Sequence, residues 1–360
     1  MVTIRELAKK CGYSASTVSM VLNEKPLVKY VPAETKAAIR RIAEEMGYRP
    51  NIFARSLRAN RSYTVGVMVF DITDPYCTYT LRGIENMLNA ASIAYLLFDA
   101  QNTRERFHRN LEFMLQRRVD ELILVANSAQ TDPAGLEVVQ NLRIPIVVIG
   151  REFEGLEFAS TVIVNNQRGG YLAVEHLYRL GHRNIAFIRG PKTIADSILR
   201  WEGVLKFAKE VDLNVQRESI LELGQVPTTP SEGLEAVKLL MRTGHCGFTA
   251  VLAFDDMTAL GVIRGLSEAG LEVPGECSVI GFDDIDAAGY YNPPLTTIRQ
   301  PMSRMGEEAS TALLGCVNSG QEKRRAQVVH KVLEPELVVR KSTQCPPKRK
   351  RRGSRVLSKK

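Results

Sequence analysis

Short runs of apolar, mostly β-branched residues recur along the chain from residue 63 to about residue 343, and stretches with helical spacing separate them. The first series of runs covers residues 64–70, 94–100, 121–126 and 145–150. The second series covers residues 184–190, 219–224, 250–254 and 277–282. Alternation of buried strands with helices is typical of a doubly wound parallel sheet. Because the alternation occurs twice, the pattern predicts an α/β core of two lobes.

The first 47 residues show helical spacing instead. Thr3 is followed by Glu6 three residues later, which is the pattern of a capping box. An apolar stripe at helical spacing follows, formed by Ile4, Leu7, Ala8 and Cys11. Gly12 ends this helix and Ser14 caps the next one. A third helix, from Ala33 to about Met46, completes an all-α helix-turn-helix unit.

The second of these helices carries small polar residues at many positions. We expect Val18 and Leu22 to pack inward, whereas the outward positions are Ala15, Ser16, Ser19 and Met20. Small side chains at a helix N-terminus permit a close approach to phosphates and base edges in a DNA major groove. The spacing by itself also fits a three-helix bundle with a serine-rich exposed face, because not all such units bind DNA.

The net charge of +8 is unevenly distributed. Residues 1–62 hold 12 basic and 5 acidic residues, a net charge of +7. Residues 344–360 hold 8 basic and no acidic residues, whereas the 28 basic and 35 acidic residues between these segments give −7. A cationic head on an anionic body indicates a polyanionic partner for the head. The basic tail lacks apolar periodicity, so we expect it to be disordered, either as a solvated tail or as a non-specific DNA contact.

Several other classes of protein lack support in the sequence. No segment approaches the ~18 consecutive apolar residues of a membrane span, and the N-terminus lacks the layout of a secretory signal. We therefore expect a cytoplasmic protein with no membrane partner. The six cysteines form no CxxC pair and no zinc spacing with the five histidines, so we expect neither a metal nor another cofactor.

The tripeptide "FDD" occurs twice, at 254–256 and 282–284, and raises the alternative of an enzyme. Glycoside hydrolases use a pair of carboxyl groups as acid and base. Adjacent side chains on a strand point to opposite faces, so neither doublet is itself a catalytic pair. No P-loop or nucleophile elbow is present. We therefore predict that the chain is not an enzyme. A sugar-binding module or a glycoside-processing enzyme without a DNA role is the alternative.

The stretches "TIRELAKKCGYSASTVSMVLN" and "ETKAAIRRIAEEMGYRPNIFARSLR" resemble the DNA-binding head and hinge of the lactose-repressor (LacI/GalR) family. The resemblance continues to about Thr343. It implies a helix-turn-helix head at 1–47, a hinge helix within 48–62 and an effector-binding, dimerising core at 63–343. The residues it implies at DNA are Thr3, Ser14, Ala15, Ser16, Thr17, Ser19, Met20, Asn23, Asn51, Ala54, Arg55 and Leu57. Met20 stands where the family often has a polar residue, so the base preference is expected to be unusual.

The hinge segment "NIFARSLR" at 51–58 is too short to be stable as an isolated helix, although Asn51 is a good N-cap. A partner would therefore order it. The family resemblance implies that Leu57 wedges into the minor groove and kinks the duplex. The alternative for Leu57 is a packing role in the dimer. Arg55 and Arg58 are expected to contact phosphates.

Polar residues follow several of the predicted strands, and ligands of parallel sheets bind beyond the carboxyl ends of strands. These residues are Asp71, Asp74, Tyr76, Arg151, Asp255 and Asp283, and Arg200 lies near the start of a later helix. Carboxylates, guanidinium groups and an aromatic ring suit a polyhydroxylated ligand. An aspartate after a strand also commonly caps the next helix, which is the role we favour for Asp71.

The core resembles the type I periplasmic-binding-protein fold through "DDMTALG", "GFDD" and "PLTTIRQP". The resemblance implies lobe 1 at about 63–163 and 295–326, and lobe 2 at about 164–294 and 327–343. It also implies an interlobe effector cleft lined by Asp74, Tyr76, Arg151, Arg200, Asp255, Phe282 and Asp283. We expect Arg200 and Asp283 to face each other from opposite lobes. Asp255 stands where the family commonly has Asn, which replaces an amide donor with a group that only accepts.

These patterns and the resemblance together predict a sequence-specific, DNA-binding transcriptional regulator that acts as a repressor. Its expected partners are a pseudo-palindromic operator in double-stranded DNA, a small polar effector such as a sugar or sugar derivative, and a second copy of the chain. The symmetry of such operators favours a homodimer or a higher oligomer built from dimers.

Overall fold

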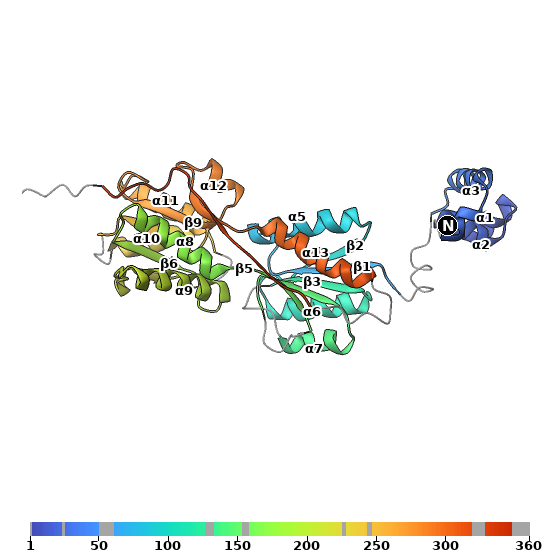
Figure 1. The fold of residues 1–360 in the computed structure, drawn as a ribbon, viewed down its shortest axis with the longest axis horizontal. Coiled ribbons are helices and arrows are strands. Elements are labelled where there is room, and N and C mark those ends of the chain that lie inside the picture. Colours follow the sequence, from blue (N-terminus) through green and yellow to red (C-terminus); the bar gives the residue numbers. More distant parts are fainter. Residues whose placement is uncertain are drawn as a thin grey trace, which may run out of the picture. The chain divides into compact units, whose positions relative to one another are not determined.

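The chain divides into two units, residues 1–62 and residues 63–360, which are described separately below (Figure 1). The computed structural model describes residues 2–23, 26–49, 61–126, 133–152, 158–224, 228–242, 247–318 and 328–347. No helix in these ranges combines the length and the apolar character that crossing a membrane requires.

The described residues of the first unit form α1 (Ile4–Cys11), α2 (Ala15–Leu22), a 3-10 turn η1 (Pro26–Tyr30) and α3 (Ala33–Glu45). The predicted capping box is present, because the Glu6 N–H donates to Thr3 Oγ1 and the Thr3 N–H donates to the Glu6 carboxylate. Gly12 ends α1 with a φ of +72°, a backbone conformation that costs glycine little. The three helices pack around fully buried side chains: Leu7, Val18, Val21 and Ile39. The predicted helix-turn-helix unit is confirmed.

In the second unit, lobe 1 is built on a six-stranded parallel sheet with the order β11-β5-β4-β3-β1-β2. Its strands are β1 (Thr64–Val69), β2 (Ala94–Asp99), β3 (Glu121–Val125), β4 (Ile146–Ile149), β5 (Ser160–Val164) and β11 (His330–Leu333). Its helices are α5 (Pro75–Ala90), α6 (Arg104–Gln116), α7 (Pro133–Asn141) and α13 (Met302–Asn318).

Lobe 2 has the same plan, with the strand order β12-β10-β9-β8-β6-β7, and differs in that β12 is antiparallel to β10. Its strands are β6 (Ile185–Arg189), β7 (Ile220–Glu222), β8 (Ala250–Leu252), β9 (Ser278–Asp283), β10 (Thr296–Arg299) and β12 (Glu336–Val338). Its helices are α8 (Asn166–Arg179), α9 (Ala195–Glu210), α10 (Pro230–Arg242), α11 (Asp256–Glu268) and α12 (Asp286–Tyr290), and a 3-10 turn η2 covers Arg217–Ser219.

Both sheets are covered by helices on both faces, which explains why their central strands are apolar without alternation. The strands β3 and β4 are buried along their whole length. All eight predicted apolar runs contain a strand, so the predicted pair of doubly wound sheets is confirmed.

Glycines bring neighbouring helices together closely in both lobes. A Cβ at Gly170 of α8 would lie 1.9 Å from the backbone oxygen of Arg200 in α9. A Cβ at Gly83 of α5 would lie 1.9 Å from the backbone oxygen of Ser303 in α13. Only the absence of a side chain permits these contacts, so the position of α9, and with it Arg200, depends on a glycine in α8.

The chain passes between the lobes at three crossovers: Asn165, Gln300–Pro301 and Glu334–Pro335. The predicted lobe boundaries after residue 294 were therefore wrong. The segment 296–299 is a strand of lobe 2, because it pairs in parallel with β9. The segment 330–333 is a strand of lobe 1, because it pairs with β5. The lobe boundaries depend on which of the two sheets each short strand joins. The apolar pattern alone does not show this pairing.

Candidate functional site

A cavity of about 220 Å³ lies between the lobes at the carboxyl ends of the strands. Lobe 1 lines it with Phe70, Thr73, Asp74, Pro75, Tyr76 and Ala126. Lobe 2 lines it with Ile194, Asp196, Arg200, Thr228, Thr229, Phe254, Asp255, Met257 and Asp283, and Gln300 lines it from a crossover. The strand-end rule thus locates the cavity.

Five of the seven residues expected in the cleft line this cavity: Asp74, Tyr76, Arg200, Asp255 and Asp283. Phe282 does not, because it is 2% exposed and lies beneath Arg200, whose guanidinium carbon is 3.7 Å from the centre of its ring. Arg151 is not among the lining residues either, although its charge acts on the Asp196 carboxylate. Its Nε donates to the backbone oxygen of Glu152 at 3.3 Å.

Arg200, in the second turn of α9, is held by two hydrogen bonds and one ion pair. Its Nε donates to Asn166 Oδ1 at 2.9 Å, and its Nη1 donates to the Phe254 backbone oxygen at 2.8 Å. Its Nη2 lies 3.8 Å from Asp283 Oδ1, with both side chains largely buried. The expectation that Arg200 and Asp283 face each other from opposite lobes was therefore wrong. Both belong to lobe 2, because α9 follows β6 of the same sheet that contains β9.

Asp283 ends β9 in a strained backbone conformation. Its φ is +120° and that of Asp284 is +60°, values that cost side-chain-bearing residues on the order of 1–3 kcal/mol each. Gln300 Nε2 donates to Asp283 Oδ1 at 2.6 Å and helps to hold this carboxylate towards the cavity. Burial raises the pKa of Asp283 well above its usual value, against the opposing effect of Arg200.

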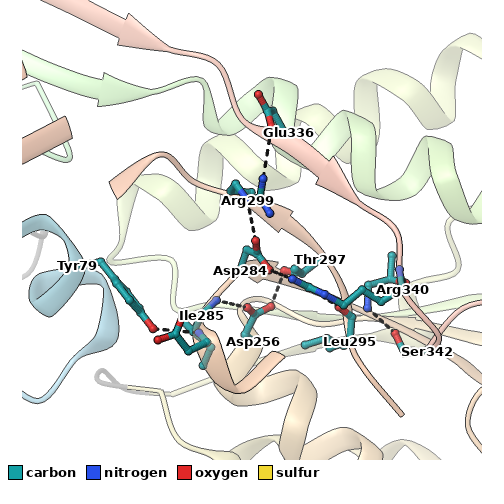
Figure 2. A network of polar contacts seen from close by, with 12 residues as sticks. Tyr79, Asp256, Asp284, Ile285, Leu295, Thr297, Arg299, Glu336, Arg340 and Ser342 are labelled. Carbon is teal, nitrogen blue, oxygen red and sulfur yellow. Dashed lines mark hydrogen bonds and ion pairs between the residues drawn. The ribbon is translucent and has the colours of Figure 1, made fainter. Parts of the chain in front are cut away.

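A network of polar contacts stabilises the loop after β9 (Figure 2). Asp284 accepts from Arg299 Nε at 2.7 Å and also binds Arg340 Nη2, which lies on the last segment of the core. Asp256 accepts from Thr297 Oγ1 at 2.5 Å and from the Ile285 N–H at 2.9 Å. These contacts stabilise the conformation that points Asp283 into the cavity.

Asp74 enters the cavity from lobe 1 as the N-cap of α5. Its carboxylate accepts from the Tyr76 N–H at 2.8 Å. Burial raises its pKa to about 7, and the negative charges of Asp255 and Asp71 contribute to the increase. Asp71, which we expected to cap this helix, instead accepts from Thr73 and from Asn102 and organises the loop before it.

Two further lining residues, Tyr76 and Asp255, are held by contacts within their own lobes. The ring of Tyr76 stacks on Phe70, with ring centres 6.2 Å apart. Asp255 caps α11 by accepting from the Thr258 N–H at 2.7 Å, and the hydroxyl of Thr228 donates to its other oxygen. The cavity therefore combines fixed carboxylates with an aromatic wall.

Five polar residues of the cavity were not predicted from the sequence: Thr73, Asp196, Thr228, Thr229 and Gln300. Asp196 lies at the start of α9, after β6, so the strand-end rule could have found it. Gln300 directly follows β10, a strand that the apolar pattern did not reveal. Thr228 lies on a loop and has no such signal. Burial raises the pKa of Asp196, with Arg200 and Arg151 acting in the opposite direction.

The second helix of the head carries the expected polar face. Ser14 caps α2 by accepting from the Thr17 N–H at 3.1 Å, and its hydroxyl also contacts that of Ser16. Ala15 and Ser16 are exposed, and Ser19 and Met20 are partly exposed. Asn23 ends the helix and donates to the Ser19 backbone oxygen at 2.7 Å. The expected hinge contacts Asn51, Ala54, Arg55 and Leu57 lie outside the described residues.

Both units of the chain are similar to known proteins. Residues 3–51 match the family described as bacterial regulatory proteins, lacI family, and residues 174–343 match the periplasmic binding protein-like domain. The chain is 33% identical to the HTH-type transcriptional repressor PurR of Actinobacillus pleuropneumoniae, over 95% of this chain and 98% of the relative. The PurR repressor of Pasteurella multocida is also 33% identical, over 95% and 98% of the two chains. The chain belongs to the lacI family.

Solved structures of lacI-family proteins are also similar to this chain. The lac repressor dimer bound to operator and the anti-inducer ONPF matches with a TM-score of 0.82 and 25% identity, over 95% of this chain and 99% of that one. The regulator CelR in complex with cellobiose matches with a TM-score of 0.70 and 26% identity, over 95% and 100% of the two chains. This lacI-family chain is a DNA-binding transcriptional repressor, and the prediction that it is not an enzyme is confirmed by these relatives.

Proposed function

We propose that this repressor binds a pseudo-palindromic operator as a homodimer, and that a small polar effector in the interlobe cavity sets its affinity for DNA. The observation that carries the proposal is the cavity itself, in which charged residues of both lobes meet beside the crossover at Gln300. A ligand there contacts both lobes, so it binds one degree of lobe closure more tightly than another. Only such differential affinity shifts a conformational equilibrium.

The effector class that we propose is a carbohydrate or a carbohydrate derivative. The CelR structure contains cellobiose, and a lacI-family regulator of Enterococcus faecium with 30% identity contains ribose. That second match has a TM-score of 0.68 and covers 79% of this chain and 100% of that one. In the cavity, fixed carboxylates beside Phe70, Tyr76 and Phe254 suit the hydroxyl groups and the apolar faces of a sugar ring.

For the head, we propose that α2 lies in the major groove. Its exposed N-terminal residues are small, which permits close approach, and its free backbone N–H groups favour a phosphate. Ser16 and Met20 would read bases, and Thr3, Ser14, Ala15, Thr17, Ser19 and Asn23 would contact the backbone or the groove. From the sequence alone, Asn51, Ala54, Arg55 and Leu57 would add minor-groove contacts.

The dimer follows from the operator, since two heads reading two half-sites require a two-fold axis. The lac repressor relative was solved as a dimer on its operator. In such a dimer, closure of the lobes changes the geometry in which the two hinges are presented to DNA, and this links the cavity to the operator.

The test begins with genomic DNA fragments that the full-length protein retains, from which an operator is defined. Operator affinity is then measured by fluorescence anisotropy, at one salt concentration, with and without each member of a panel of sugars. We expect one class of sugar to change the affinity about 5–150-fold, the usual range of allosteric coupling. An unchanged affinity with a sugar that calorimetry shows to be bound in the cavity would refute the proposed control by effector.

A further inference from the structure

The cavity contains an excess of acidic groups over basic groups. Asp74, Asp196, Asp255 and Asp283 line it, whereas Arg200 is the one basic residue among the described lining residues. Arg200 already donates hydrogen bonds to Asn166 and Phe254, and its charge is paired with Asp283. Just outside the lining, Arg151 acts on Asp196, while Asp71 and Asp256 add negative charge near Asp74 and Asp283. A neutral sugar would leave most of this charge without a counter-charge.

The hydroxyl groups of the cavity do not correct this imbalance, because they already donate to the protein. Thr73 donates to Asp71, Thr228 to Asp255, and Thr229 to Glu232. The phenol of Tyr76 donates to the sulfur of Met305. A hydroxyl that donates to the protein offers a ligand only its oxygen lone pairs. These hydroxyl groups therefore offer a ligand acceptors and not donors.

An independent observation indicates that a donor is missing. Gln300 is 5% exposed, and its Oε1 is buried without a hydrogen-bond partner among the described residues. The orientation of its amide is fixed, because Nε2 donates to Asp283. A buried acceptor without a partner costs roughly 1–3 kcal/mol, so native proteins rarely retain one unless a ligand or water satisfies it. Gln300 lines the cavity, so a bound ligand is placed to donate to it.

We propose that the effector carries a protonated amino group together with hydroxyl groups on a ring, as an amino sugar does. The proposal rests on the proposed function, because it assumes that the cavity is the effector site. An ammonium group supplies three donors, no acceptor and one positive charge, which is what the cavity lacks. Phe70, Phe254 and Met257 supply apolar surface for the carbon atoms of the ring. A metal ion is not the missing cation, because no group of three His, Cys, Asp or Glu side chains in the described ranges is arranged to bind one.

Asp196 is the carboxylate that we assign to the ammonium group. Among the described residues no hydrogen-bond donor contacts its side chain, whereas the Asp74, Asp255 and Asp283 carboxylates all accept hydrogen bonds from the protein. It lies in the first turn of α9, one helical turn before Arg200. A donor at Asp196 is therefore within reach of a ligand that also contacts the residues around Arg200.

The experiment is titration calorimetry of the full-length protein with D-glucosamine, D-galactosamine and D-mannosamine. Each is compared with its parent hexose and with its N-acetyl derivative, which has no charge. We expect at least one amino sugar to bind roughly 10–100-fold more tightly than both neutral counterparts, because a charge-assisted hydrogen bond is stronger than a neutral one. We also expect the advantage to decrease at high salt, which screens the ammonium group.

Two controls make the assignment specific. Asp196→Asn should reduce the ratio of amino-sugar to hexose affinity to near one, whereas Asp212→Asn should leave the ratio unchanged. Asp212 is exposed, lies after α9 outside the cavity, and has a φ of +52° that Asn also tolerates. In wild-type protein at about pH 6, where both Asp74 and the free amino sugar are mostly protonated, amino-sugar binding should release protons, because an ammonium group in the cavity lowers the pKa of Asp74. The release is seen as heats that depend on the ionisation enthalpy of the buffer.

The inference is overturned if no amino sugar binds more tightly than its neutral counterparts. If a neutral hexose binds and changes operator affinity, the proposed function survives while the inference fails. If an amino sugar binds more tightly but operator affinity does not change, the inference about the cavity survives while the control by effector fails. The wild-type comparison and the proton release decide the matter even if Asp196→Asn does not fold.

Discussion

The two lobes have the same sheet order and the same number of strands, yet they contribute differently to the cavity between them. Lobe 2 supplies Asp196, Arg200, Asp255 and Asp283. The last three are held by hydrogen bonds or an ion pair within the protein, whereas no hydrogen-bond donor among the described residues contacts the Asp196 side chain. Among the described lining residues of lobe 1, Asp74 is the single charged one, and the others are mainly aromatic and small side chains. The shared fold therefore does not determine where the polar groups lie.

This difference suggests how a ligand acts. Lobe 2 holds its charged groups in place even without a ligand, because the network around Asp284 and the contacts of Arg200 orient them (Figure 2). Lobe 1 would close on the ligand and add Asp74 and the Phe70–Tyr76 pair. On this view, variants in lobe 2 abolish ligand binding, whereas variants in lobe 1 change the equilibrium between open and closed lobes.

The largest effect that we predict concerns the close contacts between helices that glycines permit in both lobes. Gly170→Val in lobe 2 and Gly83→Val in lobe 1 should each reduce the free energy of unfolding by roughly 3 kcal/mol or more, because the new side chain collides with backbone rather than with a movable side chain. Gly289→Ala is the control, since its Cβ meets nothing within 4 Å. Urea denaturation measures all three. Equal stability of wild type and both valine variants would mean that the helices are not so closely packed.

The second prediction separates the lobes. Asp283→Asn or Arg200→Ala should largely abolish the response of operator affinity to effector, a loss of about 1–3 kcal/mol of coupling, because each change disrupts the fixed groups of lobe 2. Tyr76→Phe in lobe 1 should retain most of the response, since it removes only a hydroxyl that donates to Met305. The measurement is operator affinity with and without saturating effector. A wild-type response in both lobe 2 variants would remove these residues from the site.

The sequence predicted the plan of the fold better than its connections. The central strands were predictable because strands buried on both faces are almost entirely apolar, as in β4 and, after Glu121, in β3. The strands β5, β10, β11 and β12 were missed as elements, because they are short and contain Thr, Ser or charged residues. Their partners depend on the packing of the whole core, so the last two crossovers could not be placed from local patterns.

The site was predictable where a residue ends a central strand, as Asp283 does, or lies in the loop after one, as Asp74 and Asp255 do. It was not predictable where the residue depends on a missed strand, as Gln300 does on β10. Phe282 shows the converse case. It is the last residue of the apolar run 277–282, and its side chain lies beneath Arg200 in the core of lobe 2 instead of facing the cavity.

The third prediction concerns the pH dependence of stability. The folded-state pKa of Asp74 is about 7, above its value in an unfolded chain, so the folded state binds this proton more tightly. The corresponding stabilisation is present below about pH 4 and is lost as the pH rises through about 7. Asp74→Asn retains an N-cap side chain and should therefore remove on the order of 2 kcal/mol of this dependence. Melting temperatures at pH 5 and pH 8 give the test, and identical pH profiles would contradict it.

The last prediction concerns a direct contact between the lobes. Tyr79 of α5 in lobe 1 packs against the apolar core of lobe 2, and its hydroxyl accepts a hydrogen bond from the Asp286 N–H at 2.9 Å (Figure 2). Tyr79→Phe removes the acceptor and keeps the ring, so it should weaken the closed arrangement by about 1 kcal/mol, the usual net value of a hydrogen bond. The effector would then bind roughly fivefold more weakly, because part of its binding energy is used to close the lobes. Tyr290→Phe is the matched control, since Tyr290 is 91% exposed. Titration calorimetry of both variants decides whether this bond stabilises closure, and an unchanged affinity in Tyr79→Phe would show that it does not.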